Sequence, residues 1–303
     1  MASKIDESYL DDNLKLKKNI HPVEFPRNNL YLINVPWQIF ETQRAVIIRE
    51  ALNSEIRKDF DIRDSNKGSW PVFVSKNGVD IESPVYWDTR NGPIFISANV
   101  EIQAFSRISG PAFIRENCKV LSALIREDTV IGPLCKIGGE VEASLIDGFS
   151  NKSHESYVGH SYIGEWVNIG AFTVTSNLKN TYGTVKVELC GKRVDSNSVK
   201  LGAFICDFVK TSSQTLILPG KYIGCFSHVT GPVIFSLPPF VIWNGYTREL
   251  IELKLDSVVE VQKRMYSRRG IAQLPEEINY VKELYELTKE TRKTVTHDSS
   301  GIL

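Results

Sequence analysis

The sequence has little of what several common classes of protein require. Its 36 basic residues only equal its 36 acidic residues, so it lacks the positive excess of a general nucleic-acid binder. Its longest strongly apolar stretch, 233–243, is interrupted by Pro238 and Pro239 and is too short to span a bilayer. Residues 1–20 are charged throughout and contain no apolar signal core. We therefore expect a cytoplasmic protein that binds neither nucleic acid nor membrane.

Cysteine and glycine are sparse where they would carry function. The five cysteines form no Cys-x-x-Cys pair and no disulfide-scaffold density, and no His/Cys cluster has zinc spacing. We therefore predict no metal site, and we expect the cysteines to be small buried hydrophobes. They are Cys118, Cys135, Cys190, Cys206 and Cys225. Only Gly68 and Gly78 precede Gly92, so residues 1–80 cannot build a glycine-rich phosphate loop.

What the sequence does have is an apolar residue at every sixth position. A period of six fits neither the 3.6 of a helix nor the alternation of a simple strand, and it is typical of a hexapeptide β-helix. Each hexad would form one short strand and a turn, with its aliphatic residue in the core and a following Gly easing the corner. Chance spacing in another all-β domain is disfavoured by the number of residues in register. They are Ile96, Ile102, Ile108, Ile114 and Val120; Ile125, Ile131 and Ile137; Ile163 and Ile169; and Ile205, Thr211, Ile217, Ile223 and Val229.

The pattern divides the chain into four parts. Residues 1–80 form a mixed, linker-like segment, with a short strand at 71–74. Residues 81–246 form the β-helix, and residues 247–295 form a pair of helices that can cap its open end. Residues 296–303 form a flexible tail. The fold class is therefore an all-β solenoid with a small mixed segment before it and helices after it.

Local signals place helices in the first and third parts. Asn34 is expected to cap a helix that carries Pro36 in its first turn and ends near Leu52. Gly270 is expected to end the first C-terminal helix and Pro275 to begin the second. The stripe that predicts the first of these two helices consists of Ile251, Leu255, Val258, Gln262 and Met265.

Two interruptions of the hexads indicate where a site lies. Residues 147–157 lose the aliphatic pattern and become polar, and residues 176–198 are too long for a turn and are expected to leave the solenoid as an arm. Insertions in repeat proteins commonly map to one face, which is often the binding face.

Residues 148–180 (GFSNKSHESYVGHSYIGEWVNIGAFTVTSNLKN) resemble a known group. They are similar to the β-helix tail of the sugar-1-phosphate nucleotidylyltransferase/glucosamine-1-phosphate acetyltransferase family. The resemblance extends over roughly residues 30–290, because residues 34–37 resemble the linker after the nucleotidylyltransferase domain. It implies a left-handed solenoid, a parallel homotrimer in which the arm reaches a neighbouring subunit, and acetyl-CoA as co-substrate. No glycine-rich GxGTR-like element is present, so we do not expect a self-sufficient nucleotidylyltransferase.

The resemblance also implies roles for individual residues. His154 lies at the position of the family's general base and Glu140 at that of the carboxylate that orients it. Ala171 matches a backbone contact to the acetyl group. The residues that match substrate-positioning side chains are Tyr157, Asn168 and Asn177.

Other positions depart from the family. Its phosphate-holding Arg and Lys fall on Leu124 and Glu142, and a further site Lys falls on Gly183. Leu178 and Phe172 replace a Tyr and a Gly. Glu142 would repel a phosphate, so we do not expect glucosamine-1-phosphate to be the preferred acceptor.

The chemistry can also be argued from the residues. Acyl transfer from a thioester needs a base that removes an amine proton near neutral pH, for which histidine is suited, and a carboxylate can fix its tautomer. A solvated turn histidine is the alternative for His154. His160, six residues further on, could share the face of His154, but we expect it to lie on the surface, and we expect His228 to be structural. Three cations could meet coenzyme A phosphates, although solvated surface positions are the plainer interpretation: Lys210, Lys221 and Arg248.

Two hypotheses follow. The first is an acetyl-CoA-dependent N-acyltransferase that acts on an amino sugar or its nucleotide, with His154 as base and Glu140 as its orienter. The second is a non-catalytic trimeric assembly or regulatory subunit, related to sugar-1-phosphate nucleotidylyltransferases and completing a separately encoded chain of that kind. Residues His154 and Glu140 favour the first hypothesis, and the missing phosphate anchors favour the second.

Overall fold

The computed structural model describes residues 31–189 and 191–293. The chain separates into two units, and the described part of the first, residues 31–36, contains no helix or strand. All elements below belong to the second unit, Trp37–Leu303. Within the described residues, no helix is long and apolar enough to cross a membrane.

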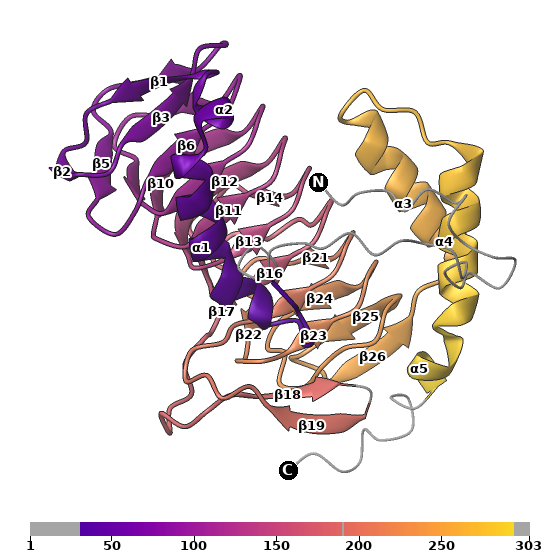
Figure 1. The fold of residues 1–303 in the computed structure, drawn as a ribbon. Coiled ribbons are helices and arrows are strands. Elements are labelled where there is room, and N and C mark those ends of the chain that lie inside the picture. The colour runs from indigo at the N-terminus through magenta and orange to yellow at the C-terminus, as the bar shows by residue number, and fades with distance from the viewer. Residues whose placement is uncertain (1–30, 190, 294–303) are drawn as a thin grey trace, which may run out of the picture. The chain divides into compact units, whose positions relative to one another are not determined.

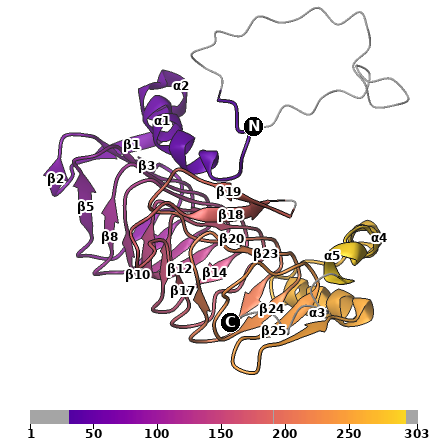
Figure 2. The ribbon, with the colours of Figure 1, turned by 90° about the horizontal axis from the view of Figure 1, so that it is seen from below.

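Short parallel strands wind into a left-handed β-helix with three faces, which confirms the predicted fold class (Figures 1 and 2). Most strands pair with strands from the coils before and after, so the ladders run along the solenoid. The first face comprises β1 (Phe60–Arg63), β3 (Val72–Ser75), β6 (Ile94–Ile96), β9 (Ala112–Ile114), β11 (Thr129–Ile131), β13 (Leu145–Ile146), β16 (Tyr162–Ile163), β20 (Phe204–Ile205) and β23 (Tyr222–Ile223).

Two long strands bend around the corner between the other two faces: β10 (Lys119–Ile125) and β12 (Lys136–Glu142). The second face contains their first halves with β4 (Asp80–Ile81), β7 (Glu101–Ile102), β14 (Asn151–Lys152), β21 (Lys210–Thr211), β24 (His228–Thr230) and β25 (Val241–Asn244). The third contains their second halves with β2 (Lys67–Gly68), β5 (Tyr86–Thr89), β8 (Arg107–Ser109), β15 (Tyr157–Gly159), β17 (Val174–Thr175) and β22 (Leu216–Ile217).

The residues of the six-residue series fill the interior of the solenoid. All of the predicted core positions are buried, from Ile96 near one end to Val229 near the other, and even Thr211 is only 5% exposed. Since about 25 cal/mol is gained per Å² of apolar surface removed from water, this column is the main source of the fold's stability. The hexad prediction is therefore confirmed.

The turns use glycine for a different reason from the one expected. Corner residues with positive φ are mostly not glycine: Phe149 and Phe172 have φ of 60° and 58°. Gly138 instead lies where the next coil comes close, since a Cβ there would be 2.3 Å from the carbonyl oxygen of Ser153. Glycine after the core residue thus permits close stacking of coils.

The polar stretch 147–157 is not a break in the solenoid. β14 continues the second face, and Lys152 pairs in register with Ile137, so a lysine takes a core position. Lys152 is only 1% exposed, and its ammonium donates hydrogen bonds to the backbone carbonyls of Gly138 and Ser156. These bonds explain how a charged side chain is accommodated where the neighbouring coils have aliphatic ones.

Helices cover the first face and a corner near the C-terminal end of the solenoid. α1 (Gln38–Leu52) buries Ile47 and Ala51 against Phe73 and Phe95, and α2 (Ser54–Arg57) follows it. Leu52 ends α1 as predicted, but Trp37, not Asn34, is the N-cap residue. The predicted cap was wrong because the chain makes a turn over residues 36–37 before the helix starts.

At the other end of the solenoid are β26 (Glu249–Glu252), α3 (Leu255–Ser267), α4 (Pro275–Leu287) and α5 (Lys289–Lys293). Pro275 begins α4 and Gly270 follows α3 with φ of 68°, as predicted. The residue stripe that predicted α3 began too early, because its first member, Ile251, lies in β26, which pairs antiparallel with β25.

The arm within residues 176–198 contains an antiparallel hairpin of β18 (Lys186–Leu189) and β19 (Lys192–Asp195). The parallel ladders also begin before residue 81, because β3 already pairs with β6 and β2 with β5. The strand expected at residues 71–74 corresponds to β3.

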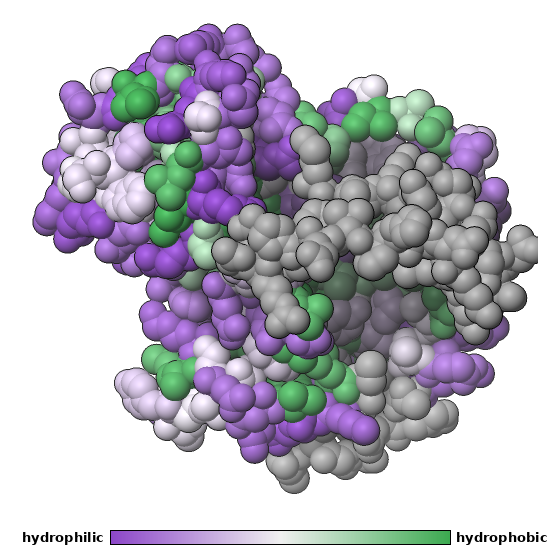
Figure 3. Space-filling view, in the orientation of Figure 1, coloured by the Kyte–Doolittle hydropathy of each residue, from purple (hydrophilic) through white to green (hydrophobic). Residues whose placement is uncertain are grey.

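Among the cysteines, Cys118 and Cys135 are buried and Cys206 and Cys225 are half-buried, all as free thiols. Cys190 lies outside the described residues. In Figure 3 most of the coloured surface is hydrophilic, and apolar residues appear on it in separate small groups.

Candidate functional site

The second and third faces meet at a corner that holds three of the predicted site residues. His154 lies in the turn between β14 and β15, and Asn168 and Ala171 lie on the next coil. The three line one cavity of about 440 Å³ at this corner. The ring of His154 is exposed and makes no hydrogen bond with the rest of the described chain. It is therefore available to a ligand in the cavity.

The backbone of the same corner offers a donor. The N–H groups of Gly170 and Phe172 bond to Thr211 and to the carbonyl of Glu155, whereas the N–H of Ala171 between them has no acceptor among the described residues. Ala171 lines the cavity that contains His154. An N–H group in this position can receive an oxygen atom that gains negative charge.

Glu140 is not joined to His154. Its carboxylate forms an ion pair with Arg126 of the preceding coil. Glu140 and Tyr157 are register partners on the third face, whereas His154 belongs to the turn before β15. The role of Glu140 as orienter of the histidine stays a prediction.

Tyr157 and Asn177 are brought together on the third face. The Nδ2 amide of Asn177 donates to Tyr157 Oη at 2.8 Å, and Tyr157 Oη donates to Glu142 Oε2 at 2.7 Å. Lys200 Nζ donates to Glu142 Oε1 at 3.2 Å. Burial acts to raise the pKa of Glu142, but the bonds from Tyr157 and Lys200 outweigh it, so the carboxyl has a lowered pKa. Its charge is thus balanced by Lys200, and its expected repulsion of phosphate is reduced.

His160 belongs to this network, so the expectation that it lies on the surface was wrong. Its ring is half-buried, and its Nδ1 lies 2.9 Å from Nδ2 of Asn177. With the amide as donor, the proton of the ring is on Nε2. Burial lowers the pKa of His160, while Glu142 acts in the opposite direction. The side chain was missed because Asn177 comes from the next coil, 17 residues further along the chain.

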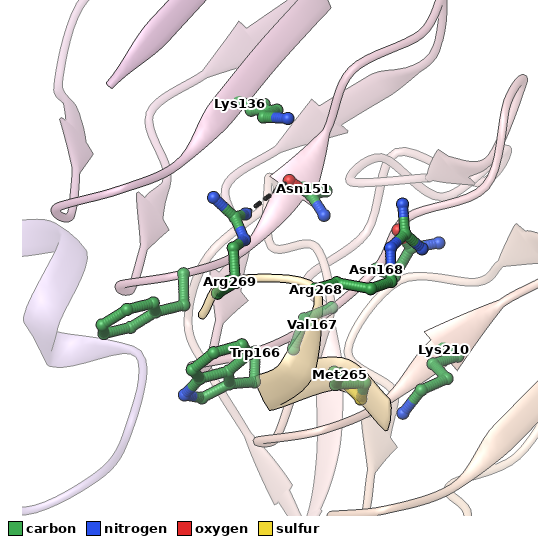
Figure 4. A pocket seen from close by; sticks show the side chains of 10 residues that line it. Lys136, Asn151, Trp166, Val167, Asn168, Lys210, Met265, Arg268 and Arg269 are labelled. Carbon is green, nitrogen blue, oxygen red and sulfur yellow. Dashed lines mark hydrogen bonds between the residues drawn. The ribbon is translucent and has the colours of Figure 1, made fainter. Parts of the chain in front are cut away.

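A second cavity, of about 280 Å³, adjoins the first on the second face (Figure 4). Both are lined by Lys136, Asn151, Asn168 and Arg268. Lys136 and Asn151 were not singled out from the sequence, although each directly precedes a core position of its hexad and they are register partners. That spacing was a usable signal. Arg268 follows α3, and only the fold brings it to this face.

The other basic candidates differ in their placement. Lys210 lines the second cavity, whereas Lys221 and Arg248 line neither. His228 is half-buried beside Lys210, and burial with the charge of Lys210 lowers its pKa to about 4.

Fold and cavity together define a hexapeptide-repeat β-helix with a histidine at the corner of two faces.

No protein-family model matches the chain. It is 36% identical over 188 residues to a bifunctional sugar-1-phosphate nucleotidylyltransferase/acetyltransferase of Sulfurisphaera tokodaii, a match that covers 61% of this chain and 46% of that protein. It is 42% identical over 104 residues to the bifunctional protein GlmU of Methanocaldococcus jannaschii, covering 34% of this chain and 25% of the relative. These matches confirm the resemblance to that family. They span less than half the length of the curated relatives.

Two solved structures are similar to the chain at lower identity. A UDP-N-acetylglucosamine acyltransferase of Francisella novicida is 14% identical with a TM-score of 0.35, over 73% of this chain and 78% of that one. A serine-to-cysteine mutant of AntD, an N-acyltransferase of Bacillus cereus solved with dTDP-4-amino-4,6-dideoxyglucose and coenzyme A, is 17% identical with a TM-score of 0.27. That match covers 65% of this chain and 88% of the other.

Proposed function

We propose that this chain transfers an acyl group from acetyl-CoA to the amine of an amino sugar or of its nucleotide. The observation that carries the proposal is the cavity that His154, Asn168 and Ala171 line together. The confirmed resemblance to a family whose members are named as acetyltransferases supports it.

His154 is the base in this proposal. Its exposed ring has no competing partner in the described chain, so one ring nitrogen can accept the proton that the attacking amine loses. The acquired proton then passes to the departing sulfur as the carbon–sulfur bond breaks, which restores the neutral imidazole. Acetyl-CoA supplies the acyl group as an activated thioester.

The residues beside His154 have positioning roles. The N–H of Ala171, which has no acceptor among the described residues, donates to the acyl oxygen as that atom gains charge. The exposed amide of Asn168 orients a hydroxyl or amide group of the substrate. Around the corner, the Oη of Tyr157 and the amide oxygen of Asn177 accept hydrogen bonds from sugar hydroxyls, since both amide hydrogens of Asn177 are already donated to Tyr157 and His160.

The test is an assay of free thiol release. The full chain is mixed with acetyl-CoA and a panel of amino sugars, amino-sugar phosphates and amino-sugar nucleotides. We expect release with at least one acceptor and loss of that release in His154→Ala. Absence of release with all acceptors, together with no binding of acetyl-CoA by calorimetry, would overturn the proposal.

A non-catalytic assembly or regulatory subunit is the second candidate. The observation that favours it is the pairing of Glu140 with Arg126, which leaves His154 without the expected carboxylate. For this candidate we expect a co-expressed nucleotidylyltransferase chain to co-purify with the protein, and no thiol release from the protein with or without that chain.

A further inference from the structure

Four cationic side chains line the second cavity. Lys136 comes from β12, Lys210 from β21, and Arg268 and Arg269 from the segment that follows α3 (Figure 4). They therefore derive from three segments that are distant in the sequence. The apolar part of the lining includes Trp166, which stacks on Phe149 at 4.5 Å between ring centroids.

Within the described residues, these cations have no carboxylate partner. Among the described residues that line the two cavities there is no Asp or Glu. Arg269 donates to the amide oxygen of Asn151 at 3.0 Å, and Lys210 donates to the backbone carbonyl of Phe208 at 2.9 Å. In the described part of the chain, Lys136 and Arg268 form no ion pair.

The contrast with the preceding coil shows that this arrangement is local. Lys119 is the register partner of Lys136, and its ammonium is paired with Glu101 at 2.6 Å. Lys119 and Lys136 thus hold equivalent positions on neighbouring coils. The first is ion-paired, whereas the second, at the cavity, has no ion pair within the described residues. The cations that line this cavity repel one another, and an anion bound among them would offset that repulsion.

The burial of Lys210 also favours a bound anion in this cavity. Its side chain is half-buried, and burial alone lowers its pKa to about 8. A bound anion would offset this desolvation penalty by its opposite charge and hold the ammonium in its charged form.

We infer that this cationic cavity binds the phosphate or diphosphate group of a ligand whose reacting end reaches His154. Guanidinium and ammonium groups are the usual partners of phosphate oxygens in proteins. The phosphate then lies on the second face, whereas Glu142 occupies the third face, around the corner from it. Phosphate recognition is thereby displaced from the positions of Leu124 and Glu142 to another side of the solenoid. That the ligand is a reactant rests on the proposed function, whereas the anion site itself does not.

The first experiment measures binding of pyrophosphate to the full chain by calorimetry, in the absence of acyl donor. We expect one site per chain, with affinity reduced at least tenfold in Lys136→Gln and in Arg268→Gln. Both side chains reach solvent, so these variants should fold; their unfolding temperatures check this. The matched control, Lys119→Gln, removes a cation from the equivalent position on the preceding coil and should leave the affinity within twofold. Absence of binding, or an equal loss in all three variants, would overturn the site.

The second experiment identifies the source of the phosphate by displacement of pyrophosphate. Displacement by UDP but not by coenzyme A assigns the group to an acceptor nucleotide, and the converse assigns it to the acyl donor. If coenzyme A displaces pyrophosphate, the same measurement is repeated with dephospho-coenzyme A, which lacks the 3′-phosphate. Displacement by this compound assigns the site to the diphosphate, and no displacement assigns it to the 3′-phosphate. Displacement by neither UDP nor coenzyme A overturns the assignment to a reactant. If pyrophosphate binds as described but no acceptor yields thiol release, the proposed function fails and the anion site stands.

Discussion

The carboxylate of Glu140 is ion-paired with the guanidinium of Arg126 across two neighbouring coils. Both side chains are partly exposed, at 32% and 45%, and such pairs contribute about 0–1 kcal/mol. Because this charge is already engaged, we expect Glu140→Gln to lower acyl transfer by less than about tenfold. Arg126→Gln should have an effect of similar size, as measured by kcat in the thiol-release assay. A loss in Glu140→Gln as large as that in His154→Ala would instead assign the carboxylate to the histidine.

His154→Ala should lower acyl transfer by about two to four orders of magnitude, the usual contribution of a general base. Since the ring is exposed and makes no hydrogen bond in the described chain, the unfolding temperature should hardly change. The matched control is Glu155→Gln, the next residue of the same exposed turn, which should retain activity. Equal activity of His154→Ala and wild type would leave the fold intact but exclude His154 as base.

The core of the solenoid could be predicted from the sequence because its signal is local and periodic. Ile131 and Ile137 show their burial by spacing alone, since each short strand contributes one inward residue per hexad. The same rule failed at Lys152, where hydrogen bonds to carbonyls of neighbouring residues replace apolar contact. No spacing pattern reveals that compensation.

The candidate site was predicted less completely. His154, Asn168 and Ala171 were identified by resemblance, and the fold places them on one cavity. Arg268 could not be predicted, because a residue after α3 reaches the second face only through tertiary packing. The ion pair of Glu140 was missed for a related reason, since its partner depends on the register between coils.

Lys152→Met should change how stability depends on pH. Burial lowers the pKa of Lys152 to about 8, below its ordinary 10.5, with Glu155 and Glu140 opposing the shift. Between these two pKa values the unfolded chain binds more protons, so the wild-type free energy of unfolding rises with pH. Relative to Lys152→Met, it should rise by at most about 1.4 kcal/mol per pH unit in this interval. Urea unfolding of both proteins across the interval measures the difference, and a constant difference would contradict the prediction.

The resemblance implies a homotrimer in which the arm reaches a neighbouring subunit. Light scattering should then report three times the chain mass of 34.2 kDa. Tyr182 in the arm is 72% exposed, so Tyr182→Asp should favour dissociation without disturbing the folded chain. Tyr280→Asp on α4, where the ring is 63% exposed, is the control that should leave the mass unchanged. A wild-type monomer at micromolar concentration would contradict the trimer.

Gly138→Ala should disturb the corner that carries His154. A Cβ at Gly138 would lie 2.3 Å from the carbonyl oxygen of Ser153 and 3.4 Å from the nitrogen of His154, so the turn must move. We expect the free energy of unfolding to fall by about 1–3 kcal/mol, as for other overpacked sites. Acyl transfer should fall at least tenfold, because small displacements of a catalytic group are costly. Gly183→Ala in the arm, where the nearest atom is the flexible Lys179 Nζ at 3.4 Å, is the matched control and should change neither quantity. A Gly138→Ala variant that loses stability but keeps full activity would show that catalysis does not depend on the position of this turn.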